Sequence, residues 1–391
     1  MVSRMGVRIA AGLSTDADAR VGAIEAAASA RDALDGEHAD LALVFASGAH
    51  LAAPEATLEG VHEALLPRRL VGCGAGGVLA AGREHEDGTA VAVWAAAVDG
   101  ALAEPFRAEA EEIDGGWAVE GLPNLDGADG AVLLPDPYSF PTDRVLDELA
   151  GLAPGVPVVG GLSSARTLEG SSALFYDDEV IDGGAVGIRF EGVEVLPCVS
   201  QGAAPIGPEL TITACEGHVI HELAGAPALA KVREVVAALS ARERTLVAEG
   251  LLVGLVIDAG KPEFGPGDFL VRGLLGADPD TGSMAVGAPV HTGQVIRLHA
   301  RDAESANRDL RRSLDTTLEA LGGAPARGAL CFSCNGRGQA MFDVPDHDAG
   351  LLARALEGAP AAGFFAAGEI GPVGGESFLH GFTATVAVFG P

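Results

Sequence analysis

The chain has 391 residues, 48% of them hydrophobic and 20% charged, which is typical of a globular protein of two or three domains and not of a disordered chain. Its 55 acidic and 25 basic residues give a formal net charge of −30. This excess of acid argues against nucleic acid and anionic membranes as partners, because phosphate groups bind to clustered Lys and Arg. Lys231 and Lys261 are the only lysines, and together with abundant Ala and Gly they indicate a GC-rich bacterial source.

No segment of the sequence predicts secretion or membrane insertion. The five cysteines are an odd number in a long chain, which does not indicate a disulfide framework. The first residues lack the apolar core of a signal peptide, and no stretch approaches the roughly 20 apolar residues of a membrane span. We therefore predict a cytoplasmic protein.

A pattern of strand, helix, strand and strand occurs three times along the chain. The copies span Leu41–Val98, Gly130–Phe190 and Gly328–Phe389, and each has a glycine-rich segment at its second strand. The helix of the third copy carries Leu351 and Leu352 on its apolar face. The pattern predicts an α/β fold, with α+β as the alternative, built from repeated units with mixed sheets.

The segment between the second and third copies is organised differently. Residues 251–301 contain consecutive strand-like runs with Gly282 and Gly293 in the turns, and a helix is predicted from about Asp302 to a stop at Gly322. The segment GHVIHELAGAPALAKVREVVAAL (217–239) predicts a further amphipathic helix with Leu229 and Val232 in register, which places the domain break near 215–230. We predict two domains, 1–222 and 223–391.

Polar residues gather where the strands of the third copy end. Cys334, Asn335 and Arg337 close its first strand, Glu369 follows its second strand, and His380 comes soon after. The carboxyl ends of neighbouring parallel strands meet at one edge of a sheet. We therefore expect these five residues to converge on one concave surface that binds a small molecule.

Arg337 and Glu369 suggest what such a surface recognises. Arg is the usual fork for a carboxylate, and a glutamate can receive an ammonium group, so the two would hold a zwitterion such as an amino acid. An Arg337–Glu369 ion pair that ties two loops fits the sequence equally well. Because Arg337 is placed in a loop, we expect its replacement by Ala to leave the fold largely intact.

Other motifs point to other functions with less support. The glycines of the segments 72–77 and 160–164 could cradle an anion, but neither segment is a P-loop, and structural turns explain them better. Cys331 and Cys334 form a CxxC without a second ligand pair, so no metal site is predicted, and no cofactor either. An enzymatic role would use Cys334 as a nucleophile with His380 as its base, or the pair Glu369 and His380.

Seven motifs, taken in order, resemble those of the FIST family, which pairs a FIST N-terminal domain with a FIST C-terminal domain. They are DLALVFAS (40–47), LVGCGAGGVL (70–79), VPVVGGLSS (156–164), ACEGHVIHELAGAPAL (214–229), FLVRGLLGADPDTGSMAVGAPVHTGQVIRLHARD (269–302), CNGRG (334–338) and GFFAAGEIGP (363–372). The resemblance covers nearly the whole chain.

The resemblance implies an intracellular sensory protein of signal transduction that binds a small polar ligand, for which amino acids are suggested. No kinase, cyclase, chemotaxis or F-box segment is recognisable, so we expect a stand-alone sensor that acts through a separate output protein. The alternatives are an enzyme and a protein-interaction adaptor.

Overall fold

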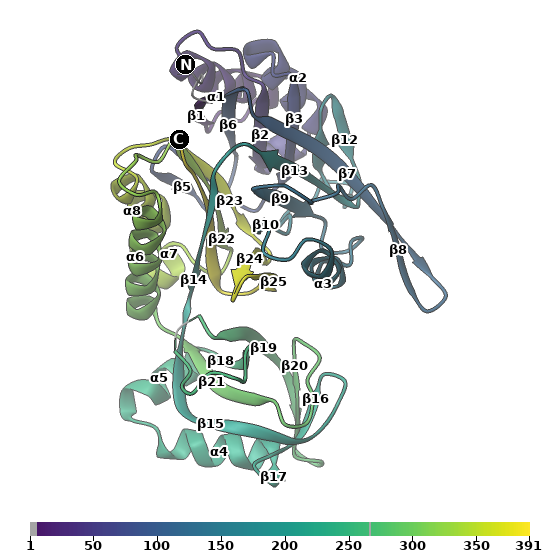
Figure 1. Cartoon of the computed structure of the whole chain (residues 1–391), viewed down its shortest axis with the longest axis vertical. Helices are drawn as coiled ribbons and strands as arrows, with labels where there is room; N and C mark the ends of the chain where they lie inside the picture. The colour runs from purple at the N-terminus through teal and green to yellow at the C-terminus, as the bar shows by residue number, and fades with distance from the viewer. Residues whose placement is uncertain (1–5, 266) are drawn as a thin grey trace. The chain divides into compact units, whose positions relative to one another are not determined.

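All three predicted repeats share one strand connectivity in the computed structural model, which describes residues 6–265 and 267–391 (Figure 1). The first strand of each repeat is central, a helix leads to a second strand that pairs with it in parallel, and the third strand pairs antiparallel on its other side. The prediction of a mixed α/β fold built from repeated units is therefore confirmed.

The strands and helices of the repeats have the following bounds. The central strands are β2 (Leu41–Ser47), β9 (Gly130–Pro135) and β22 (Gly328–Cys334), and the connecting helices are α2 (Pro54–Leu65), α3 (Thr142–Leu152) and α8 (His347–Ala355). The second strands are β3 (Arg69–Gly74), β10 (Val158–Gly161) and β23 (Ala361–Ala366), and the third strands are β6 (Ala90–Asp99), β13 (Ala185–Glu191) and β26 (Thr383–Phe389).

Each repeat also sends a β-hairpin into the sheet of another repeat. The hairpins are β4 (Val78–Ala80) with β5 (Arg83–His85), β11 (Leu174–Tyr176) with β12 (Glu179–Ile181), and β24 (Glu369–Val373) with β25 (Glu376–His380). The first repeat's β4 pairs with β23, the second repeat's β11 pairs with β3, and the third repeat's β24 pairs with β10. The exchange is cyclic, so each of the three sheets built on the repeats contains strands of two repeats.

A glycine occupies the same position in the second strand of every repeat. Gly72, Gly160 and Gly363 lie opposite Val44, Leu133 and Cys331 of the central strands. A Cβ atom on these glycines would lie 1.9, 1.9 and 1.7 Å from the carbonyl oxygen of the opposite residue. These glycines therefore serve close approach of two strands, and not the turns that the sequence suggested.

An aromatic core joins the three repeats. The ring of Phe45 packs against that of Phe364 with 5.0 Å between centroids, and the ring of Phe389 contacts Trp94 at 5.2 Å and Phe190 at 5.4 Å. All five side chains are buried. Burial of such side chains contributes about 1.5–3 kcal/mol each, so this cluster is a main source of the stability of the unit.

The loops that follow the second strands meet close to this core. The Oγ of Ser164 in the second repeat accepts a hydrogen bond from the N–H of Gly76 in the first at 2.9 Å and donates to the carbonyl of Phe365 in the third. Leu162 N–H donates to the carbonyl of Gly368 at 2.8 Å. This junction fixes the end of β23, where Ala366 accepts the N–H of the predicted site residue Asn335.

The chain divides into two compact units that do not follow its two halves. The first consists of Met1–Val199, Arg311–Leu379 and Ala384–Pro391, and the second of Ser200–Leu310 and His380–Thr383. The sequence predicts two consecutive domains that meet between residues 222 and 223, and this boundary stays a prediction. The first unit contains the three repeats, except for His380–Thr383 of the third.

The remaining elements of the first unit extend the sheets or cover them. They are β1 (Gly6–Ser14), α1 (Ala19–Ala33), the 3₁₀ helix η1 (Gly48–Leu51), β7 (Leu102–Ile113), β8 (Gly116–Glu120) and α7 (Gln339–Phe342). Four elements contribute residues to both units: β14 (Val195–Gln201), α6 (Ala303–Ala320), β25 through His380 and β26 through Thr383. Leu310 and Leu314 of α6 are buried.

The second unit is an antiparallel sheet with helices. Its elements are β15 (Ala203–Glu216), β16 (Val219–Leu223), β17 (Ala226–Pro227), α4 (Ala228–Ala238), α5 (Ala241–Glu249), β18 (Leu251–Val256), β19 (Phe269–Asp278), β20 (Ser283–Val286) and β21 (Val295–Arg301). The strand order β15-β21-β18-β19-β20-β16 is closed by pairing of β15 with β16. The turns at Gly282 and Gly293 have positive φ, as expected of glycine. In the parts of the chain that the structure describes, no helix is long and apolar enough to cross a membrane.

Candidate functional site

The turn that follows β22 brings three of the predicted site residues together. Cys334 ends the strand, and the backbone N–H of Arg337 donates to its carbonyl at 2.8 Å. Asn335 N–H donates to the carbonyl of Ala366 at the end of β23 (2.9 Å), so the turn is bound to the neighbouring strand. Gly338 has a φ of +80°, which lets the chain turn directly into α7.

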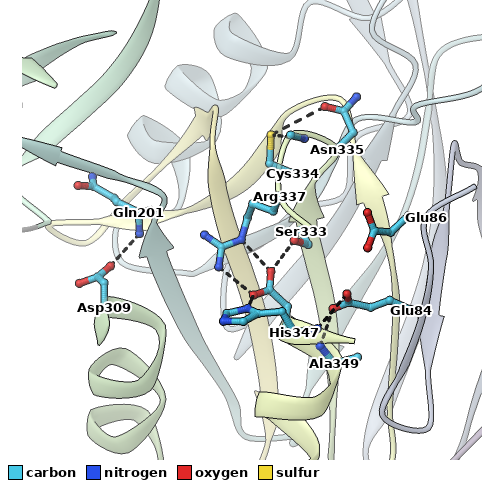
Figure 2. A network of polar contacts seen from close by, with 12 residues as sticks. Glu84, Glu86, Gln201, Asp309, Ser333, Cys334, Asn335, Arg337, His347 and Ala349 are labelled. Carbon is cyan, nitrogen blue, oxygen red and sulfur yellow. Dashed lines mark hydrogen bonds and ion pairs between the residues drawn. The ribbon is translucent and has the colours of Figure 1, made fainter. Parts of the chain in front are cut away.

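Arg337 is buried and holds a carboxylate of the chain itself (Figure 2). Its Nε lies 2.7 Å from Oδ2 of Asp348 and its Nη2 lies 2.9 Å from Oδ1. Both side chains are 1% exposed. The partner of Arg337 is therefore Asp348 in the first turn of α8, and not Glu369, as the sequence analysis considered.

Further hydrogen bonds complete the surroundings of Asp348. The Oγ of Ser333 donates to Oδ2 at 2.7 Å, and Nδ1 of His347 lies 2.8 Å from Oδ1. Burial alone would raise the pKa of Asp348, but the charge and hydrogen bonds of Arg337 and its other partners hold that pKa well below its usual range. The pair is therefore ionised at neutral pH.

The ring of Phe342 covers the guanidinium group and is itself stacked on His347. The side chains of Phe342 and His347 are stacked with 3.4 Å between centroids and an interplanar angle of 6°. The Cζ of Arg337 lies 5.0 Å from the centroid of Phe342, within the range of a cation–π contact. The orientation of Arg337 is thus fixed by packing as well as by hydrogen bonds.

The exchanged hairpin of the first repeat positions this part of the third repeat. Glu84 accepts hydrogen bonds from the N–H groups of His347 at 3.1 Å and Ala349 at 2.8 Å, and Glu86 accepts from Gln339 N–H at 2.7 Å. Two glutamates therefore cap the starts of α8 and α7. Burial, together with the charges of Asp348 and Glu86, raises the pKa of Glu84 to about 7.

One donor of Arg337 remains unused. Of the hydrogen-bonding side-chain atoms in the described residues, Nη1 of Arg337 is one of the few that are buried without an acceptor. A buried donor that lacks an acceptor costs about 1–3 kcal/mol, so such a group is expected to have a purpose or an absent partner. An oxygen of a bound carboxylate or carbonyl would satisfy it.

The other predicted site residues are placed as follows. Asn335 is exposed at the tip of the turn, and the Sγ of Cys334, which is 6% exposed, accepts from Gly336 N–H at 3.4 Å. Glu369 is buried as the first residue of β24, opposite Gly161, so it belongs to the sheet of the second repeat. His380 is the last residue of β25 and belongs to the second compact unit.

Burial of Arg337 overturns the expectation that its replacement by Ala would leave the fold intact. That expectation treated it as a loop residue in contact with water, whereas removal of one member of a buried ion pair leaves the other charge uncompensated. Sequence reasoning also missed Asp348, for which a signal existed. Asp348 precedes Leu351 and Leu352 by three and four residues, which places a carboxylate on the apolar face of the helix.

The cysteines of the CxxC motif lie as the strand pattern predicted. Cys331 is fully buried, and burial raises the pKa of its thiol well above the usual value, while Cys334 ends the strand. Within the described residues, no group of three or more His, Cys, Asp or Glu side chains is arranged to hold a metal ion.

Comparison with known proteins places the chain in a family. Residues 40–226 match the FIST N domain and residues 228–372 match the FIST C domain. The chain is 44% identical over 384 residues to the uncharacterized proteins Mb0898c of Mycobacterium bovis and MT0897 of Mycobacterium tuberculosis, an alignment that covers 98% of this chain and 99% of each relative. It is 43% identical to the uncharacterized protein Rv0628c of Mycobacterium tuberculosis, with 98% and 100% covered. The mycobacterial relatives agree with the bacterial source that composition indicated. The two domain matches and these full-length relatives show that the chain belongs to the FIST family.

Proposed function

We propose that this chain is a sensory protein of signal transduction that binds a small carboxylate-bearing ligand, such as an amino acid, at Arg337. FIST domains suggest the sensory role. The observation that carries the ligand assignment is the buried Nη1 of Arg337, which has no acceptor within the described residues. The turn 334–338 that carries Arg337 also contains the Asn335 amide and the Cys334 thiol.

The ion pair with Asp348 supports binding and not only stability. Because Nε and Nη2 are both held by Asp348, the guanidinium cannot rotate, and Nη1 keeps a fixed direction. A donor that is already oriented loses little conformational entropy when a ligand binds. The net charge of the pair is zero, so a ligand carboxylate that also carries an ammonium group would add no net charge to the site.

Thermal unfolding in the presence of candidate ligands tests the proposal. The panel contains the amino acids, the matching carboxylic acids without the amino group, and the matching amino alcohols without the carboxylate. We expect stabilisation by one or a few carboxylate compounds and none by the amino alcohols. At a concentration one hundred times Kd, the stabilisation should be about 2.7 kcal/mol.

A charge-free double variant separates binding from folding. Arg337→Met with Asp348→Leu removes the buried charges together, a change that proteins often tolerate when packing is retained. We expect this variant to fold but to lose the stabilisation by ligand. The matched control, Arg20→Met with Glu63→Leu, makes the same chemical change in an exposed pair and should bind as the unmodified chain does.

Two outcomes would contradict the proposal. Unchanged ligand stabilisation in the Arg337/Asp348 double variant would place the ligand elsewhere. Product formation detected by mass spectrometry, and lost on Cys334→Ala, would show an enzyme in place of a sensor.

A further inference from the structure

A hollow of about 520 Å³ lies at the opposite end of the central strands from Arg337. Its lining includes Arg327, which precedes β22, and Arg68, which precedes β3, whereas Cys334 and Arg337 follow the other end of β22. The seven residues of β22 span roughly 20 Å when extended, so the hollow and the turn 334–338 are separate. The volume falls in the range of about 300–1,000 Å³ that small-molecule pockets occupy.

Three arginines line this hollow in a chain whose net charge is −30. They are Arg8, Arg68 and Arg327, and they come from three separate segments of the first unit. Such a concentration of positive charge is unexpected in an acidic protein, because scattered arginines are normally surrounded by carboxylates.

The acidic neighbours do not neutralise these arginines completely. Asp40 is engaged with Arg68 at 3.1 Å and also accepts the N–H of Val98 at 2.9 Å. Arg8 lies 3.6 Å from Asp35, whose side chain is 91% exposed, and exposed pairs of this kind contribute little. For Arg327, no ion pair occurs among the described residues.

Glu37 and His38 complete the charged groups of the lining. With Asp40 compensating Arg68, the positive charges of Arg8 and Arg327 face the carboxylate of Glu37 among the described lining residues, and the exposed Asp35 lies beside Arg8 outside the lining. The arginines and carboxylates of the lining sum to one positive charge, three against two. A multivalent anion is the ligand that this balance favours.

We infer that the hollow binds a small phosphorylated molecule with two or more negative charges. Guanidinium groups present paired donors that match the oxygens of phosphate, and several of them from different directions suit a polyphosphate better than a single carboxylate. The hollow is larger than one phosphate group, which leaves room for the remainder of the molecule. The inference concerns a second site and does not rest on the proposed ligand of Arg337.

Isothermal titration with inorganic pyrophosphate, in metal-free buffer at low ionic strength, tests this inference. Inorganic phosphate and citrate serve as comparison probes for charge and for carboxylate chemistry. We expect pyrophosphate to bind at least tenfold more tightly than either, and more weakly when sodium chloride is added.

Single substitutions at exposed positions locate the binding. Arg327→Ala and Arg8→Ala should each weaken pyrophosphate binding about tenfold, while Glu37→Gln should strengthen it. The matched controls, Arg20→Ala and Glu59→Gln, change the same charges on a remote surface and should leave the affinity unchanged. Binding that is absent, that ignores Arg327→Ala, or that responds equally to the controls would overturn the inference.

Discussion

Asp348 holds Arg337 through two hydrogen bonds, of 2.7 and 2.9 Å, in a pair that is almost completely withdrawn from water. Replacement of either residue alone leaves a buried charge without compensation. We expect Arg337→Ala and Asp348→Asn each to lower the free energy of unfolding by about 3–5 kcal/mol, measured by urea denaturation. Arg20→Ala, which breaks an exposed pair, should cost less than about 1 kcal/mol. Equal effects in buried and exposed pairs would refute this account.

The stability of the protein should depend on the ionisation of Glu84. Its pKa is about 7 in the folded chain, against an ordinary value of 4.5, so folding favours the protonated carboxyl. The associated stability is present below pH 4.5 and is lost as the pH rises towards 7. Between pH 5 and pH 8, the free energy of unfolding should fall by about 2 kcal/mol more in the unmodified chain than in Glu84→Gln. Denaturant titrations at each pH give the free energy of unfolding of both proteins. If it changes with pH in the same way in both, Glu84 has an ordinary pKa and the prediction is wrong.

The glycines of the second strands should not tolerate a methyl group. In Gly363→Ala, the Cβ would collide with the backbone carbonyl of Cys331 at 1.7 Å, so the two strands must separate. We expect a loss of at least about 3 kcal/mol, at the upper end of the cost of overpacking. Gly350→Ala in α8 is the control, because the nearest atom is the flexible end of Arg354 at 3.4 Å. That substitution should be neutral or stabilise by up to about 1 kcal/mol.

Glu369 provides a test of whether the ligand carries an amino group. If the ligand is an amino acid and Glu369 receives its ammonium group, Glu369→Gln should weaken binding about tenfold. Binding of the matching carboxylic acid without the amino group should not change. Calorimetric titration of both compounds gives the comparison. A variant that keeps its preference for the amino acid would exclude Glu369 from that role.

Much of the fold could be predicted because its signals are local. Apolar runs such as LALVFA, and helical spacing such as that of Leu58, Val61 and Leu65, identified the three repeats and their common connectivity. The exchange of hairpins could not be predicted in this way. The sequence of the hairpin predicts that β4 pairs with β5. It does not predict whether the other edge of β4 pairs with β3 or with β23.

The candidate site was predicted less completely than the fold. The turn 334–338 was identified because its polar residues and glycines follow an apolar strand. The partners Asp348 and Glu84 come from other elements, and only their packing against the turn gives them a role. Glu369 was expected at the end of β23, but the chain has already entered the next sheet at this residue.

The cyclic exchange has a consequence for synthesis of the chain. Ala80 in the hairpin of the first repeat pairs with Ala362, which leaves the ribosome much later. Until then, the hairpin has one unpaired edge, and such edges promote association between chains. Nor can a nascent first repeat complete its own sheet before Leu174 emerges to pair with Cys73. Folding of this unit therefore has to wait for nearly the whole polypeptide, and chaperone dependence during translation should be greatest between these two events.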